Sequence, residues 1–174
     1  MPSKTAKPFV VAEALLAAFD TNDRINQYLI ENLPAEAWRA EPPDGKGRDI
    51  ASIVAHMHNV RVMWLKAAGG KPSPERDAKI PEQLDRNKVT PAQARKGLAE
   101  SRAALHEVLK NSLAGDGRIK GFRPDAAGFI GYLIAHDAHH RGQITMLARQ
   151  AGHPISQKAM FGMWEWGSRG TGSD

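Results

Sequence analysis

The feature that most limits the possible folds is a set of four long segments in which apolar residues recur every three or four positions. This spacing places the apolar side chains on one face of an α-helix, whereas a half-buried strand requires strict alternation, which the sequence lacks. Connections rich in proline and glycine separate the segments. The pattern predicts an all-α fold, most simply a four-helix bundle.

Local signals place the ends of the helices. Pro34 ends the first helix, because a proline ring cannot be accommodated inside a helix, and Asp49 is a good N-cap for the second. The third helix opens at Thr90 with Pro91 at its first position. Gly152 lies just beyond the fourth helix as a stop signal. The predicted helices span residues 8–33, 50–69, 91–113 and 124–150.

Two further segments extend this plan. The second and third helices are joined by the polar, proline-containing stretch KPSPERDAKIPEQLDRNKV, which is long for a link between antiparallel neighbours. A crossover along the length of the bundle would explain it. Beyond the fourth helix, the amphipathic stretch SQKAMFGMWEWG predicts a short extra C-terminal helix packed against the bundle.

Length and composition indicate one domain over residues 1–174, with an ordered core over about residues 8–166. The chain contains no cysteine, which excludes disulfides, thiolate metal sites and a cysteine nucleophile, and fits a reducing compartment. The apolar run near the N-terminus is interrupted by Glu13 and lacks a cleavage pattern. We therefore expect a cytoplasmic protein.

The sequence argues against two classes of partner. No stretch reaches the roughly 18 apolar residues that a membrane span requires. The formal charge of +5 comes from scattered lysines and arginines rather than from one basic helix face with interleaved aromatics. We expect neither a membrane nor a nucleic acid as a partner.

Two histidines interrupt the apolar stripe of the fourth helix. His136 and His140 are spaced i and i+4, so both imidazoles lie on one face about one turn apart. Buried polar rings without partners are costly, and a shared metal ion is one way to satisfy them. The same helical wheel places His139 at the edge of the stripe and turns Asp137 toward the surface.

The second helix supplies a third candidate. His56 shares a face with Ile53, Met57 and Val60, whereas His58 points nearly opposite to it. Three histidines facing one interior from two helices form an open metal site, with at least one position left for water or substrate. The alternative is that each histidine is a core residue with its own hydrogen-bond partner, which is the interpretation given to His106 and His153.

The segment LIAHDAHHRGQITMLARQAG resembles the C-terminal signature of the DinB/YfiT-like superfamily, in which HxxxHRGQ lies in the last helix of the bundle. The upstream SIVAHM resembles the family's second-helix motif. The number of helices, the long link and the spacing between the motifs agree, so the resemblance covers nearly the whole chain.

The resemblance implies a four-helix bundle in up-down-down-up order that often forms homodimers. It also implies zinc or nickel on three histidines, which correspond here to His56, His136 and His140. Characterised relatives include thiol-dependent S-transferases and isomerases that use bacillithiol, mycothiol or glutathione, while many members have no known reaction.

A metal on three neutral imidazoles keeps its charge and can lower the pKa of a bound thiol or water. Two reactions follow, activation of a low-molecular-weight thiol for transfer to a small-molecule electrophile, and hydrolysis. The residues alone do not distinguish thiol transfer from hydrolysis, and the resemblance favours the thiol transferase. A metal-binding stress-response protein without turnover and an interaction module with structural histidines remain open. The chain contains no HExxH, since Asp137 follows His136, which argues against a zinc protease.

Three further features accompany the histidines. Gln143 lies on the histidine side of its helix and either orients a ligand imidazole or hydrogen-bonds within the core. Gly142 is costly in mid-helix, so we expect another helix to approach it closely. Four aromatic residues either line the mouth of the site or belong to the core: Trp64, Tyr132, Trp164 and Trp166.

Overall fold

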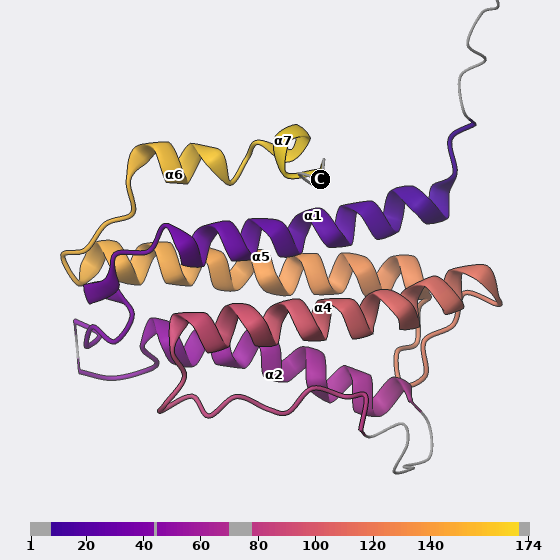
Figure 1. The fold of residues 1–174 in the computed structure, drawn as a ribbon, viewed down its shortest axis with the longest axis horizontal. Helices are drawn as coiled ribbons and strands as arrows, with labels where there is room; N and C mark the ends of the chain where they lie inside the picture. Colours follow the sequence, from indigo (N-terminus) through magenta and orange to yellow (C-terminus); the bar gives the residue numbers. More distant parts are fainter. Residues whose placement is uncertain (1–7, 44, 70–77, 171–174) are drawn as a thin grey trace, which may run out of the picture.

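The computed structural model describes residues 8–43, 45–69 and 78–170, and every regular element in these ranges is helical. Four long helices lie side by side with their axes roughly aligned (Figure 1). The all-α class predicted from the sequence is confirmed. The long helices are α1 (Val11–Glu31), α2 (Ile50–Ala68), α4 (Pro91–Ala114) and α5 (Ala126–Gln150), and the short ones are η1 (Ala35–Ala37), α6 (Gln157–Gly162) and α7 (Trp166–Gly170).

The helix ends follow their capping residues. The side chain of Asp49 accepts a hydrogen bond from the backbone N–H of Ser52, as expected of an N-cap. Thr90 forms a capping box with Gln93, and Pro91 occupies the first position of α4 as predicted. Asp125 caps α5, which therefore begins two residues later than predicted.

The other boundaries differ modestly from those predicted. Helix α1 begins at Val11 rather than at residue 8 and ends at Glu31, where Asn32 takes the C-cap position. Helix α2 ends at Ala68 with Gly69 as its C-cap, and Gly70 lies outside the described residues. The expected single C-terminal helix consists of two short helices, α6 and α7.

The described part of the crossover, residues 78–90, runs back along α2. The His58 ring donates to the carbonyl of Glu82 at 2.8 Å. The Asn59 side chain exchanges two hydrogen bonds with the backbone of Leu84. Residues 70–77 lie outside the described ranges. Because the connection returns to the beginning of α2, α4 starts at the same end of the molecule as α2 (Figure 1).

The long helices pack around a common interior. Helix α1 packs against α4 and α5, and α2 packs against the same two helices, so α1 and α2 lie at opposite corners. The chain then turns after α5 and places α7 against α1 (Figure 1). In the described part of the chain, no helix combines the length and hydropathy needed to cross a membrane.

A buried polar layer divides the apolar core into two clusters. Along α1 the apolar Phe19 and Leu29 belong to different clusters. On α5 the corresponding pair is Leu133 and Ile144. Between the clusters each long helix contributes at least one buried polar side chain. These side chains are Asn22, Asp23, Asn26, His58, Arg61, Ser101, Asp137 and His140.

Candidate metal centre

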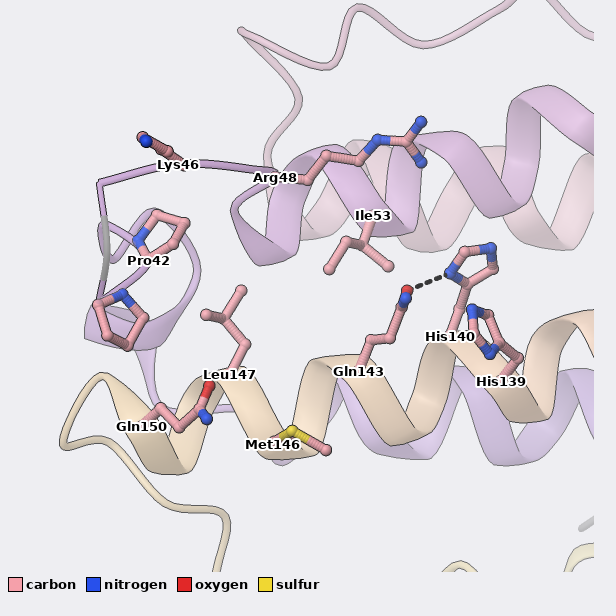
Figure 2. Close-up of a pocket in the computed structure, with 11 residues that line it drawn as sticks. Pro42, Lys46, Arg48, Ile53, His139, His140, Gln143, Met146, Leu147 and Gln150 are labelled. Carbon is pink, nitrogen blue, oxygen red and sulfur yellow. Dashed lines mark hydrogen bonds between the residues drawn. The ribbon is translucent and has the colours of Figure 1, made fainter.

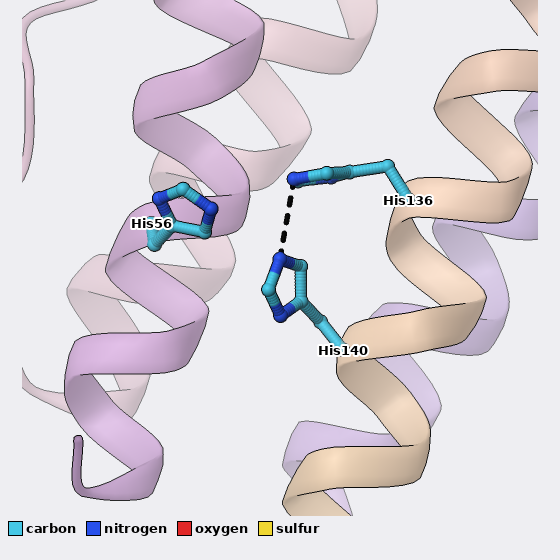
Figure 3. Close-up of side chains that lie close together, drawn as sticks. All are labelled: His56, His136 and His140. Carbon is cyan, nitrogen blue, oxygen red and sulfur yellow. Dashed lines mark hydrogen bonds between the residues drawn. The ribbon is translucent and has the colours of Figure 1, made fainter. Parts of the chain in front are cut away.

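The structure brings together the three histidines predicted from the sequence. His56 projects from α2 toward His136 and His140, which project from successive turns of α5 (Figure 3). One ring nitrogen from each residue lies within 4.8 Å of the other two. The ring centroids are 4.5 to 5.4 Å apart. The site lies at the level of the polar layer, with His140 buried and the other two rings partly buried.

The hydrogen bond to Gln143 sets the orientation of His140. The Nδ1 atom of His140 lies 2.7 Å from Oε1 of Gln143. An amide oxygen only accepts, so Nδ1 carries the proton and the lone pair of Nε2 faces the other histidines. Of the two roles considered for Gln143, this geometry matches that of a residue that orients a ligand imidazole.

The spacing of the nitrogens fits a shared ion. The Nε2 atoms of His136 and His140 are 3.2 Å apart. Two nitrogens held about 2.1 Å from one tetrahedral ion lie about 3.4 Å apart, so these two side chains need almost no rearrangement to share an ion. Neutral imidazole nitrogens suit zinc, nickel and related divalent metals. The donor set therefore fits a divalent metal with an open coordination position.

The electrostatics favour the neutral imidazoles of His56 and His140. Burial lowers the pKa of His56 to about 4, and the charges of Arg48 and the neighbouring histidines act in the same direction. Burial also lowers the pKa of His140, although its hydrogen bond to Gln143 opposes the change. Metal binding requires neutral imidazoles, so both residues are ready to act as ligands at neutral pH.

His58 points away from the three histidines, as predicted, but it is buried more deeply than they are. Its side chain is completely inaccessible, with Nδ1 3.2 Å from Oγ of Ser101 and Nε2 bonded to the carbonyl of Glu82. The helical wheel identified only His56 as facing the core, whereas both faces of α2 are covered. His58 has the structural role of fixing the crossover to α2 and α4.

Asp137 does not point to the surface, and that prediction is wrong. Its side chain is buried, and Oδ2 accepts hydrogen bonds from Asn22, Asn26 and Arg61 at 2.7 to 2.8 Å. Burial alone would raise the pKa of Asp137, but the charge of Arg61 and the hydrogen bonds hold it well below its ordinary value. The face of α5 that a wheel assigns to solvent is covered by α1.

The Asp137 network continues across three helices. Arg61 bonds both Asp137 and Asp23, and Arg141 donates to the side-chain oxygens of Asn22 and Asn26. Two cations thus balance two carboxylates. This network was not predicted from the sequence. A signal for it exists, because Asn22 and Asn26 interrupt the apolar face of α1 at the same i, i+4 spacing as the histidines of α5.

The four candidate aromatics divide into two groups. Tyr132 stacks on His136 with 6.1 Å between ring centroids, and Trp64 packs on Tyr132, Phe122 and Phe129. Trp64 and Tyr132 thus form an aromatic cluster beside the histidines. Trp164 and Trp166 line a separate pocket of about 340 Å³ with Met160, and none of the three histidines belongs to its lining.

The remaining sequence expectations have mixed outcomes. Gly142 is not approached by another helix, since a Cβ atom there would meet no atom within 4 Å, and it lines the pocket beside Trp164. His106 has a structural partner, with Nδ1 3.1 Å from the carboxylate of Asp20. His139 is exposed on α5.

A pocket opens directly beside the histidines. Its volume is about 720 Å³, within the range of small-molecule sites, and it is bounded by α2, α5 and the connection before α2 (Figure 2). His140 and Gln143 form part of its wall. A ligand in this pocket would therefore lie against His140, one of the three converging histidines.

Comparison with known proteins agrees with the resemblance seen in the sequence. No curated protein and no solved structure matches the chain significantly. The model of the DinB family matches residues 1–165, which include all four long helices and the three histidines. The chain belongs to the DinB family.

Proposed function

We propose that this protein is a divalent-metal-dependent enzyme that activates a low-molecular-weight thiol for transfer to a small-molecule electrophile. The observation that carries the proposal is the convergence of His56, His136 and His140, the last of which forms part of the wall of a ligand-sized pocket. Zinc or nickel is the metal we expect, because three imidazole nitrogens suit both.

The protein's own residues contribute positioning and charge. Gln143 fixes the tautomer of His140, and the low pKa of His56 keeps its nitrogen unprotonated. When bound, the metal would lower the pKa of a coordinated thiol and so favour the thiolate at neutral pH. The pocket beside His140 would position the electrophile, which supplies proximity.

The first test is metal content. Protein purified without a histidine tag, analysed by elemental mass spectrometry, should contain close to one equivalent of a divalent transition metal. The second test is thiol-dependent turnover of a panel of electrophiles by the metal-loaded protein. A metal-free preparation that also fails to take up zinc or nickel would contradict the proposal.

Two other functions use the same metal centre. A metal-dependent hydrolase would turn over esters or amides without any thiol, because the same ion can activate water. A metal-binding stress-response protein would contain the ion and show no turnover with either panel. The thiol requirement distinguishes the transferase from the hydrolase, and turnover distinguishes both from the third function.

We also propose that the long helices form an up-down-down-up four-helix bundle. The return of residues 78–90 along α2 and the packing of α1 and α2 on both α4 and α5 support this order. A homodimer acting in the cytoplasm is the assembly and location that we expect from the family resemblance.

A further inference from the structure

The pocket beside the metal centre carries an uneven distribution of charge. Its described lining includes two cations, Lys46 and Arg48, and no carboxylate. Asp49, the acidic residue that follows Arg48 in sequence, is already engaged by Arg39 at 3.0 Å and by the N–H of Ser52. A pocket of one sign of charge concentrates ligands of the other sign, so this pocket favours an anion.

Arg48 is placed to bring that anion to the metal centre. It precedes the N-cap of α2, and Figure 2 shows its side chain extending over the pocket toward His140. Its charge contributes to the lowered pKa of His56, which places the guanidinium within electrostatic reach of that histidine. No carboxylate among the described residues forms an ion pair with Arg48, whereas Arg39, Arg61 and Arg95 all have one.

Apolar side chains form much of the remaining wall. Figure 2 shows Ile53 between Arg48 and Gln143, with Leu147 nearer to Pro42, and Met146 also belongs to this wall. Met146 is 60% exposed, although it is a large apolar side chain on a helix surface. An apolar ligand segment lying here would remove Met146 from water, which favours binding.

We propose that the pocket binds an amphipathic monoanion, a carboxylate with an apolar alkyl or aryl tail. The carboxylate pairs with Arg48 beside the metal centre, and the tail lies along Ile53 and Leu147 toward Pro42. This inference rests on the proposed function, for which it names the substrate class. A guanidinium suits this role because it can donate two parallel hydrogen bonds to a carboxylate.

The test compares octanoate, octanol, octylammonium and propionate as probes for the full-length, metal-loaded protein by isothermal titration calorimetry. Octanoate should bind at least about tenfold more tightly than octanol, the effect expected of one charge-assisted contact. Propionate should bind more weakly than octanoate because it lacks the tail, and octylammonium should not bind.

The variants assign these preferences to Arg48. Arg48→Ala should weaken octanoate binding about tenfold and leave octanol binding unchanged. Arg149→Ala is the matched control, because it removes the same charge from an exposed position of α5 outside the pocket wall. Arg48→Glu should reverse the preference between octanoate and octylammonium. Equal octanoate affinity in wild type and Arg48→Ala would overturn the proposal.

The same titrations on metal-stripped protein separate this inference from the proposed function. Octanoate binding could disappear when the metal is removed and yet be unchanged by Arg48→Ala. This result would show that the metal alone holds the carboxylate, which would overturn the inference without contradicting the proposed metal centre. An Arg48-dependent preference for octanoate in a protein that takes up no metal would support the anion site while contradicting the proposed function.

Discussion

His140 is the residue on which the metal centre most depends, because it is the most buried of the three histidines and its nitrogen is oriented by Gln143. His140→Ala leaves two ligands, which hold an ion poorly. We expect this variant to contain little metal and to lose the decrease in melting temperature that a chelator causes in the wild type at pH 7.5.

His153→Ala is the control for this measurement, because His153 follows α5 and is not one of the three converging residues. His58→Ala is a poor control, because it removes two buried hydrogen-bond partners. An identical chelator response in wild type and His140→Ala would mean that the histidines are core residues.

The pKa of His56 gives the metal-free protein a defined pH dependence. The folded value is about 4, below the ordinary value of about 6.5, so the unfolded chain binds a proton first as the pH falls. Stability is fully present above pH 6.5 and declines as the pH falls toward 4. Urea unfolding of chelated protein should show this decline, and His56→Gln should reduce it. His153→Gln, in the loop after α5, should leave it unchanged.

Single residues show how far the sequence could predict the site. His136 and His140 were identifiable because they interrupt an apolar stripe at a spacing that suits one ion. Asp137 was assigned wrongly because a helical wheel describes one helix, and only the packing of α1 places Asn22 and Asn26 against it. Arg48 carries no periodic signal, since it lies in a connection.

At the scale of secondary structure, Arg61 joins all four long helices. It lies on α2, bonds the buried carboxylates of Asp23 on α1 and Asp137 on α5, and donates to the carbonyl of Leu98 on α4. Arg61→Ala would leave two carboxylates buried without their cation, so we expect a loss of about 3–5 kcal/mol in the free energy of unfolding. Urea denaturation of the metal-free protein measures this loss.

A compensating variant tests that explanation. Replacing Arg61 with Met together with Asp23→Asn removes one cation and one carboxylate, and Asp137 remains beside Arg141. This double variant should be more stable than Arg61→Ala, since fewer uncompensated charges remain buried. A double variant that is less stable than Arg61→Ala would show that packing, rather than charge, explains the loss.

The helix ends were the part of the fold that local sequence predicted well. Asp49 and Thr90 cap their helices through contacts with residues three positions away, which depend on nothing distant. The arrangement of the helices around one another depends instead on contacts such as that of His58 with Glu82, which no local signal reveals. The buried polar layer likewise depends on contacts between distant residues.

At the scale of the whole molecule, large apolar side chains remain exposed. Phe9, Phe161 and Trp164 are each more than 60% accessible in the described structure. Surfaces of this kind favour association, and the family resemblance indicates a homodimer. Light scattering at micromolar concentration should give twice the 19.0 kDa chain mass. A 19.0 kDa particle would contradict the prediction.

The metal ligands are far apart in the chain. His56 and His136 are separated by about eighty residues, which include the whole of the crossover and α4. A bound ion would close this long loop as a reversible cross-link, and a permanent cross-link over such a span restricts the unfolded chain by about 4–5 kcal/mol. The ion would then slow unfolding, since α2 and α5 could not separate until it dissociates. Resistance to proteolysis would follow the residence time of the metal.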